Sequence, residues 1–305
     1  MSTNASNANG QAAPASWMPV SLLIFSAAMW GLTWWPLRQF AAAGLSGPLM
    51  SLASYGLVGL AGLPFLLREH PAWRGQVHLL LLLALFGGWA NASFVWALMI
   101  GDVVRVMLLF YLAPVWSVIG GWLFLGESVG RRRLLAVLSA IAGAFLVIGG
   151  TEALNAPLSF ADFLALSSGF AFAANNLTTR AARSIPMVSK TIAVFIGCGA
   201  VSALMAWQHG AALPVWSGTL AIALFAFGFG WLVLATATTQ YSVTHIEAGR
   251  AGIILIVELL AAVLSAMLIG GEKVAIHEWI GGALITAAVV IEATDTPAET
   301  VEETS

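Results

Sequence analysis

The chain has 305 residues, of which 60% are hydrophobic and 9% are charged. Soluble domains carry about 25% charged residues, so a chain this apolar must be an integral membrane protein. The net charge of −2 and the lack of a basic stripe give no basis for nucleic-acid binding. The single cysteine, Cys198, excludes an internal disulfide, and the five histidines show no ligand spacing. We therefore expect no metal site and no cofactor.

The chain consists of apolar segments between two polar tails. Residues 1–16 contain no lysine or arginine, so they are predicted to be a disordered tail rather than a signal peptide. The C-terminal segment, residues 293–305, is polar and acidic and is also predicted to be disordered. Between the tails we predict ten helices that cross the lipid bilayer, at about 17–37, 48–67, 77–98, 104–125, 133–150, 160–179, 190–207, 217–238, 251–270 and 276–292.

One stretch of sequence occurs twice. Asp102–Glu127 and Glu247–Glu272 each have an acid, an arginine three residues later, an apolar run and a final Gly-Glu. Such self-similarity in a membrane protein is typical of a transporter built from repeats. We therefore predict two repeats, residues 17–150 and 151–292, each with five helices.

An odd number of helices per repeat inverts the second repeat in the membrane relative to the first. If the N-terminus is cytoplasmic, nine lysines and arginines lie on the cytoplasmic side and three on the other. This bias follows the positive-inside rule and predicts that both termini are cytoplasmic. Inverted repeats place a ligand site between the halves, near the midplane.

These features resemble the drug/metabolite transporter superfamily, of the ten-helix type with two EamA repeats. The matching residues are Trp30-Gly31, Pro114, Glu258 and the Gly-Glu pairs at 126–127 and 271–272. Glu258 is followed by Leu259 where the family often has proline, so the resemblance does not imply a kink there. The tryptophan-rich first half is most similar to the aromatic amino acid exporter branch. That resemblance implies export of aromatic and other neutral amino acids across a bacterial inner membrane.

Glu258 is the most informative candidate, because it lies about eight residues from the start of its apolar segment. Eight residues correspond to about 12 Å along a helix. An ionisable group at that depth is costly and suggests proton coupling or a partner for a substrate ammonium. A structural role is also open. Glu258 shares a stripe with Ala262, Ala266 and Gly270, and small residues at this spacing let helices approach closely.

Aromatic and polar residues inside the segments complete the candidate site. Trp30 and Trp34 share one face of the first helix and suit an aromatic substrate. Buried amides and hydroxyls need partners, either on other helices or on a zwitterion. The central-cavity candidates are Trp30, Trp34, Asn91, Trp96, Tyr111, Asn175, Asn176, Trp231, Thr238 and Glu258.

Arg105 and Arg250 are candidates for gates at the two mouths of the transporter. Each follows an acid by three residues, a spacing that allows an ion pair along a helix. The alternative is an arginine that snorkels at a segment end. No nucleophile–base pattern or nucleotide motif is visible, so we expect neither catalysis nor ATP-driven transport.

The sequence therefore predicts an all-α secondary transporter that exports small neutral metabolites by alternating access. Two other functions stay open. One is a proton-coupled exporter of lipophilic cations or drugs, with an ionised Glu258 and cation–π contacts from the tryptophans. The other is a passive pore. The oligomeric state, the substrate range and the coupling ion are not determined by the sequence.

Overall fold

The computed structural model describes residues 17–125, 130–147, 158–245 and 248–294, and over these ranges it contains helices and no strand. The all-α fold class is confirmed. The helices are α1 (Trp17–Gly31), α2 (Trp34–Ala42), α3 (Gly47–Arg68), α4 (His70–Trp73), α5 (Val77–Ile100), α6 (Val103–Phe110), α7 (Ala113–Leu125), α8 (Arg131–Val147), α9 (Phe160–Ala181), α10 (Met187–Gln208), α11 (Gly218–Phe225), α12 (Val233–His245), α13 (Ala248–Leu268) and α14 (Ile276–Thr294).

Several predicted elements fall on residues outside these ranges. They are the two tails, the first Gly-Glu pair at 126–127 and Glu247. The side chains of Pro114, Ser117 and Arg250 and the surroundings of Gly121 are likewise outside what the structure describes, although these residues lie in α7 and α13.

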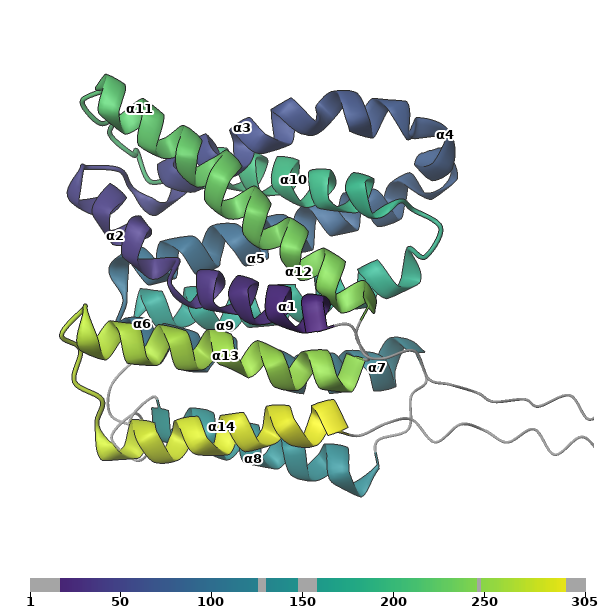
Figure 1. Cartoon of the computed structure of the whole chain (residues 1–305), viewed down its shortest axis with the longest axis vertical. Helices are drawn as coiled ribbons and strands as arrows, with labels where there is room; N and C mark the ends of the chain where they lie inside the picture. Colours follow the sequence, from purple (N-terminus) through teal and green to yellow (C-terminus); the bar gives the residue numbers. More distant parts are fainter. Residues whose placement is uncertain (1–16, 126–129, 148–157, 246–247, 295–305) are drawn as a thin grey trace, which may run out of the picture.

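The helices form long rods that lie side by side, some of them made of two consecutive helices such as α1–α2, and the chain reverses direction between successive rods (Figure 1). Five stretches are long and apolar enough to cross a membrane, by length and composition: Trp17–Ala42, Gly47–Arg68, His70–Ile100, Met187–Gln208 and Gly218–Ser242. Three shorter apolar helices, Leu134–Val147, Ile254–Leu268 and Ile276–Ile291, lie beside them. The broken rod α6–α7 and the more polar helix α9 occupy the remaining predicted segments.

The bundle has two distinct ends. At one end of the bundle α3 and α9 finish, and α1 and α8 begin (Figure 1). Arg68, Arg131 and Arg180 belong to these helix termini, and we call this the arginine-rich end. The connections at 43–46, 101–102 and 269–275 lie at the other end, which we call the Glu272 end (Figure 1). The two ends therefore carry the basic residues that the sequence analysis assigned to opposite sides of the membrane.

Helices of the first repeat pack against helices of the second repeat. Equivalent helices of the two repeats pack on each other, α3 on α10 and α8 on α14. Helix α1 packs on α13, while its counterpart α9 packs on α6 and α7. The two helices of each pair, α3–α10 and α8–α14, run in opposite directions (Figure 1). This is the arrangement that two inverted repeats produce.

Two of the rods are interrupted one turn before a proline. The first rod breaks at Leu32 and Thr33, ahead of Pro36, and the fourth breaks at Tyr111 and Leu112, ahead of Pro114. Proline lacks a backbone N–H, and its ring clashes with the carbonyl four residues earlier, so the helix cannot continue unchanged. Helix α13 carries Glu258 and Leu259 without interruption, as expected without a proline.

The eighth rod is interrupted differently. Residues Ala226–Leu232 form a π-helix between α11 and α12, and this segment contains Gly228 and Gly230. Such π-helical turns are rare and frequently occur at functional sites. In membrane transporters, interrupted helices mark the substrate region, because irregular backbone is tolerated there only where protein or a cavity satisfies it.

Candidate functional site

Helix α13 is the element on which the candidate residues converge. The first rod lies along it, and the closest contact is at Gly31. A Cβ atom on Gly31 would lie 2.4 Å from the Glu258 carbonyl oxygen and 2.8 Å from the Ala261 Cβ. Ala262 and Ala266 are fully buried. The stripe of small residues therefore does serve close helix packing, and its partner is the first rod.

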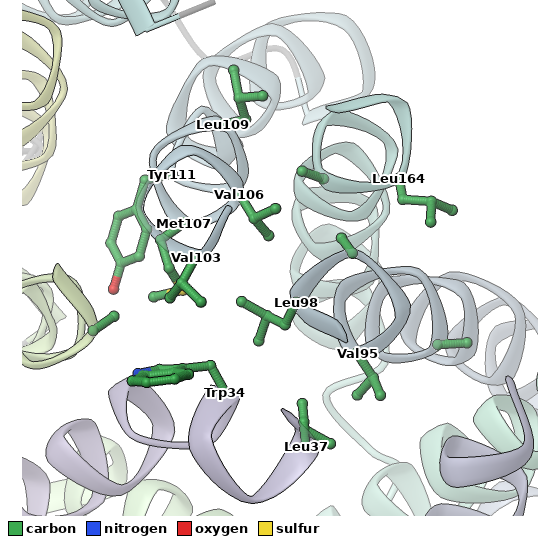
Figure 2. Close-up of a cluster of buried hydrophobic side chains, with 14 of the residues drawn as sticks. Trp34, Leu37, Val95, Leu98, Val103, Val106, Met107, Leu109, Tyr111 and Leu164 are labelled. Carbon is green, nitrogen blue, oxygen red and sulfur yellow. The ribbon is translucent and has the colours of Figure 1, made fainter. Parts of the chain in front are cut away.

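The tryptophan after the break in the first rod continues this contact. The Trp34 indole N–H donates to the Ser265 hydroxyl at 2.8 Å, and Trp34 is only 3% exposed. Figure 2 shows the Trp34 ring beside Met107 and Val103 of α6, with the Tyr111 phenol on the same side of the cluster. One turn further along the first rod, the Arg38 guanidinium lies 5.7 Å from the centre of the Trp34 ring.

Glu258 contacts Tyr111, the residue at the break between α6 and α7. The Tyr111 phenol and the Glu258 carboxyl group lie close to each other. The Tyr111 hydroxyl also donates to the Leu255 carbonyl oxygen at 3.1 Å. The contact therefore connects an interrupted helix of the first repeat with α13 of the second repeat. Two residues that the sequence analysis selected separately are thus brought together.

Two further tryptophans connect the first rod with the eighth. The Trp30 indole donates to the Thr239 hydroxyl of α12 at 3.3 Å. Trp231, in the π-helical segment, donates to the Thr33 hydroxyl at the break of the first rod, at 3.0 Å. Both indoles are partly buried, so each is oriented by a polar contact across helices and keeps part of its ring exposed.

The remaining cavity candidates lie elsewhere. The Asn91 amide donates to the Gly87 carbonyl oxygen of its own helix. The Oδ1 atom of Asn175 is buried beside the same glycine and has no hydrogen-bond partner among the described residues. Asn176 is exposed. Trp96 packs edge-on against Phe160 and His209 near the Glu272 end. Thr238 donates to carbonyls of its own helix, and it is Thr239 that contacts Trp30.

Glu272 is a central residue at its end of the bundle. Its carboxylate accepts from the backbone N–H groups of Val103 and Val104, at 3.0 and 3.2 Å, and so caps the N-terminus of α6. It also pairs with Arg38 at 3.0 Å. Burial raises the pKa of Glu272, and the two amides and the Arg38 guanidinium oppose that shift. Arg38 and Glu272 also line a cavity of about 390 Å³ that is open to the surface.

Arg105 makes a second link at this end, with a partner that the sequence analysis did not select. Its guanidinium forms a two-pronged ion pair with Asp162 of α9, with N–O distances of 2.6 and 2.8 Å. Asp102, the expected i,i+3 partner, accepts instead from the Arg105 backbone N–H and caps α6. An arginine bonded in this way crosses between the repeats and does not simply extend into solvent.

Sequence reasoning missed Thr33, Thr239, Ser265 and Asp162. The motif Ser159-Phe160-Ala161-Asp162 is a capping box, which marks the start of α9, and Pro36 marks the break near Thr33. The hydroxyl partners of the tryptophans had no such signal, because single serines and threonines inside apolar segments are common. Only the packing of helices from opposite repeats shows which hydroxyl meets which indole.

The fold and these contacts define a polytopic α-helical membrane transporter built from two inverted repeats. The chain belongs to the EamA-like transporter family, which matches residues 17–149 and 159–293. The family resemblance drawn from Trp30-Gly31, Glu258 and the Gly-Glu pairs is thus confirmed at the level of the superfamily. The aromatic amino acid exporter branch is not confirmed.

Two relatives extend this assignment. The chain is 30% identical over 237 residues to an uncharacterized transporter of Archaeoglobus fulgidus, covering 76% of this chain and 81% of that one. It is 27% identical over 264 residues to a riboflavin transporter of Rhizobium johnstonii, covering 82% of each. A solved crystal structure of a protein 16% identical in sequence superposes with a TM-score of 0.55, over 89% of this chain and 95% of the other. That likeness shows the fold alone.

Proposed function

We propose that this EamA-like transporter is a secondary carrier that exports small neutral metabolites bearing an aromatic ring, with aromatic amino acids as the first candidates. The observation that carries the proposal is that three interrupted rods are joined to one another or to α13 by hydrogen bonds. These interruptions are the breaks at Thr33 and Tyr111 and the π-helical segment with Trp231. Binding sites of repeat-built transporters lie at such interruptions.

The side chains at this place suit an amphipathic ring compound. Trp30 and Trp231 offer partly exposed indoles, which favour stacked or edge-on contact with an aromatic ring. Thr239 and Glu258 add a hydroxyl and a carboxyl group from two different rods. Polar groups placed among aromatic side chains are the usual composition of a small-molecule site.

Riboflavin is the second candidate substrate. A relative that covers 82% of this chain is a riboflavin transporter, and riboflavin is a neutral molecule with a planar ring system. The same indoles would stack on its ring. Riboflavin has no ammonium group for Glu258, whereas a zwitterionic amino acid does, so the two substrates place different demands on that carboxylate.

The direction of transport and the orientation belong to the same proposal. Nine basic residues against three favour a cytoplasmic arginine-rich end, with both termini on that side. In this structure the ion pairs Arg38–Glu272 and Arg105–Asp162 join the two repeats at the opposite end of the bundle. We propose that the protein sits in a bacterial inner membrane and that these contacts close its outer mouth when the site faces the cytoplasm.

Counterflow in liposomes that contain only the purified protein tests the proposal. Vesicles are preloaded with unlabelled tryptophan or riboflavin, and the labelled compound is added outside without an ion gradient. A carrier gives transient accumulation that saturates with the outside concentration. Flux that neither saturates nor shows counterflow would replace the carrier with a pore, and activity with riboflavin alone would replace the amino acid substrates.

A matched pair of variants locates the site. Trp30→Phe removes the donor to Thr239 and part of the ring area, and we expect the half-saturation concentration to rise about tenfold, equivalent to about 1.4 kcal/mol. Trp207→Phe is the control, because Trp207 is 77% exposed at the end of α10. Equal effects of the two substitutions would remove Trp30 from the substrate site.

A further inference from the structure

We propose that the arginine-rich end carries a binding surface for the phosphate headgroups of anionic phospholipids, formed by the connection from α3 to α5 together with the connection from α9 to α10. The inference goes beyond the proposed transport function and does not depend on the substrate. It starts from the contacts that join the two connections, from the exposed arginines on them, and from the apolar side chains beside these arginines.

Two hydrogen bonds join the connections. The Gln76 amide, just before α5, donates to the Ser184 hydroxyl at 2.6 Å. The Ser189 hydroxyl, in the first turn of α10, donates to the carboxylate of Glu69, the residue that follows α3. Residues 66–80 of the first repeat and 180–190 of the second therefore form one continuous surface, which we call the basic corner.

The basic corner is strongly positive. Residues 66–80 and 180–190 contain five lysines and arginines but a single acid, Glu69, and its carboxylate is bonded to Ser189. Arg68, Arg74 and Arg183 are exposed, and none of the three has an ion-pair partner among the residues that the structure describes. Their charge is therefore directed to the surroundings of the protein.

The arginines at the opposite end of the bundle are arranged differently. Arg38 and Arg105 each pair with a carboxylate of the other repeat, so they join parts of the protein. An arginine without a carboxylate keeps its five N–H donors for an external anion, and its planar fork matches the oxygens of a phosphate group. The charge of the basic corner therefore fits a partner that bears phosphate.

Apolar side chains beside the arginines indicate that this partner is a lipid. Phe65 lies three residues before Arg68, on the same face of α3, and its side chain is exposed. Met187 and Val188, at the start of α10, are also exposed. A phospholipid offers acyl chains to these side chains and a phosphate to the arginines, whereas a soluble anion would contact the arginines alone.

Trp73 lies between Arg68 and Arg74 in sequence and is suited to the level of the headgroups. Its indole N–H donates to the Leu66 carbonyl oxygen at 3.0 Å, and the His70 ring stands edge-on to it with 4.7 Å between the ring centres. Tryptophan is enriched at membrane–water interfaces. The Trp73 ring is therefore held where a lipid bound to the basic corner would lie, and its fluorescence can report on that lipid.

Quenching of this fluorescence measures the proposed binding. The purified full-length protein in a neutral detergent is titrated with phosphatidylglycerol that has brominated acyl chains, and with phosphatidylcholine that has the same chains. The Trp73 signal is the difference between the wild-type protein and Trp73→Phe. We expect half-maximal quenching at an about tenfold lower concentration of phosphatidylglycerol, equivalent to about 1.4 kcal/mol. Equal concentrations for the two lipids would overturn the proposal.

Two double variants of equal charge locate the surface. Arg74→Gln combined with Arg183→Gln removes one arginine from each connection and should lower the preference for phosphatidylglycerol to about twofold or less. Arg131→Gln combined with Arg132→Gln is the control, because α8 begins at the same end but lies on the opposite side of the bundle from α4 (Figure 1). An equal loss in both double variants would mean that positive charge acts generally and not at the basic corner.

Inorganic phosphate separates a lipid from a soluble anion. The titration is repeated in sodium phosphate and in sodium chloride at the same ionic strength, so that screening is equal in the two buffers. We expect the preference for phosphatidylglycerol to be the same in both. A preference that phosphate abolishes and chloride leaves intact would assign the arginines to a soluble anion. The titration involves no transport, so a failure of the counterflow assay leaves its result unaffected.

Discussion

At the residue scale, the absence of a side chain at one position decides how the first rod meets α13. Gly31 allows the backbone of α1 to lie against the carbonyl of Glu258. Trp30, its neighbour in sequence, then points to α12, and Trp34 points to Ser265. Replacing Gly31 would therefore displace both tryptophans as well as the helix.

We predict that Gly31→Ala lowers the free energy of unfolding by about 1–3 kcal/mol, because its Cβ would overlap the Glu258 carbonyl oxygen. The measurement is unfolding in detergent, followed by tryptophan fluorescence. Gly230→Ala is the matched control, since a Cβ there has no neighbour within 4 Å. Equal stability of the two variants would show that the contact at Gly31 can relax without cost.

At the element scale, the N-terminus of α6 holds the Glu272 end together. Two carboxylates of the second repeat bind this N-terminus. Glu272 accepts from backbone amides of α6, and Asp162 pairs with the Arg105 side chain of α6. Since α6 belongs to the first repeat, both contacts cross between the halves. An opening of this end must break them.

A double-mutant cycle measures the Arg105–Asp162 pair. We predict a coupling free energy of about 1–3 kcal/mol between Arg105→Gln and Asp162→Asn, because Asp162 is only 2% exposed in the pair. Asparagine keeps an acceptor for the Ser159 backbone N–H, so the start of α9 should survive. Additive single effects would mean that the ion pair contributes little to closure.

Labelling of a cysteine measures the opening of the same end. Ala41 lines the cavity beside Arg38 and Glu272, so Ala41→Cys in a Cys198→Ser background reports access to it. We expect Glu272→Ala to raise the labelling rate about tenfold if the three contacts of Glu272 contribute about 1.4 kcal/mol to closure. Glu69→Gln, just after α3 at the arginine-rich end, should leave the rate unchanged. An unchanged rate in Glu272→Ala would remove these contacts from the gate.

At the scale of the whole molecule, the two ends of the bundle differ in charge, and this difference predicts the orientation. Arg68, Arg131 and Arg180 lie at one end, opposite Arg38 and Glu272 (Figure 1). Positive charge is retained on the cytoplasmic side of a membrane, so we expect that end to face the cytoplasm.

Impermeant thiol reagents test this orientation in intact cells that express single-cysteine variants in a Cys198→Ser background. Ala212→Cys, in the exposed connection between α10 and α11 at the Glu272 end, should be labelled from outside. Gly75→Cys, in the connection between α4 and α5, should be labelled only after the membrane is opened. The reverse pattern would show that the arginine-rich end faces outward.

The sequence by itself determined the class of protein and the places of the helices. Sixty per cent apolar residues in long runs must be buried in lipid, and the repeat of Asp102–Glu127 at Glu247–Glu272 implies two inverted halves. The sequence analysis predicted continuous helices at 17–37 and 104–125, whereas the structure breaks them ahead of Pro36 and Pro114, where the missing N–H is a local property. Local chemistry and periodicity are sufficient for all of these features.

Only the tertiary structure decided which residues meet. Arg105 pairs with Asp162, 57 positions away, and not with Asp102, because α9 of the opposite repeat packs against α6. Trp34 meets Ser265, 231 positions away, through the close approach at Gly31. Inside a membrane, apolar surface is equally satisfied by lipid or by another helix, so hydrophobicity alone does not select partners. Shape and hydrogen bonding across the two repeats make that selection, and they do so only in the folded bundle.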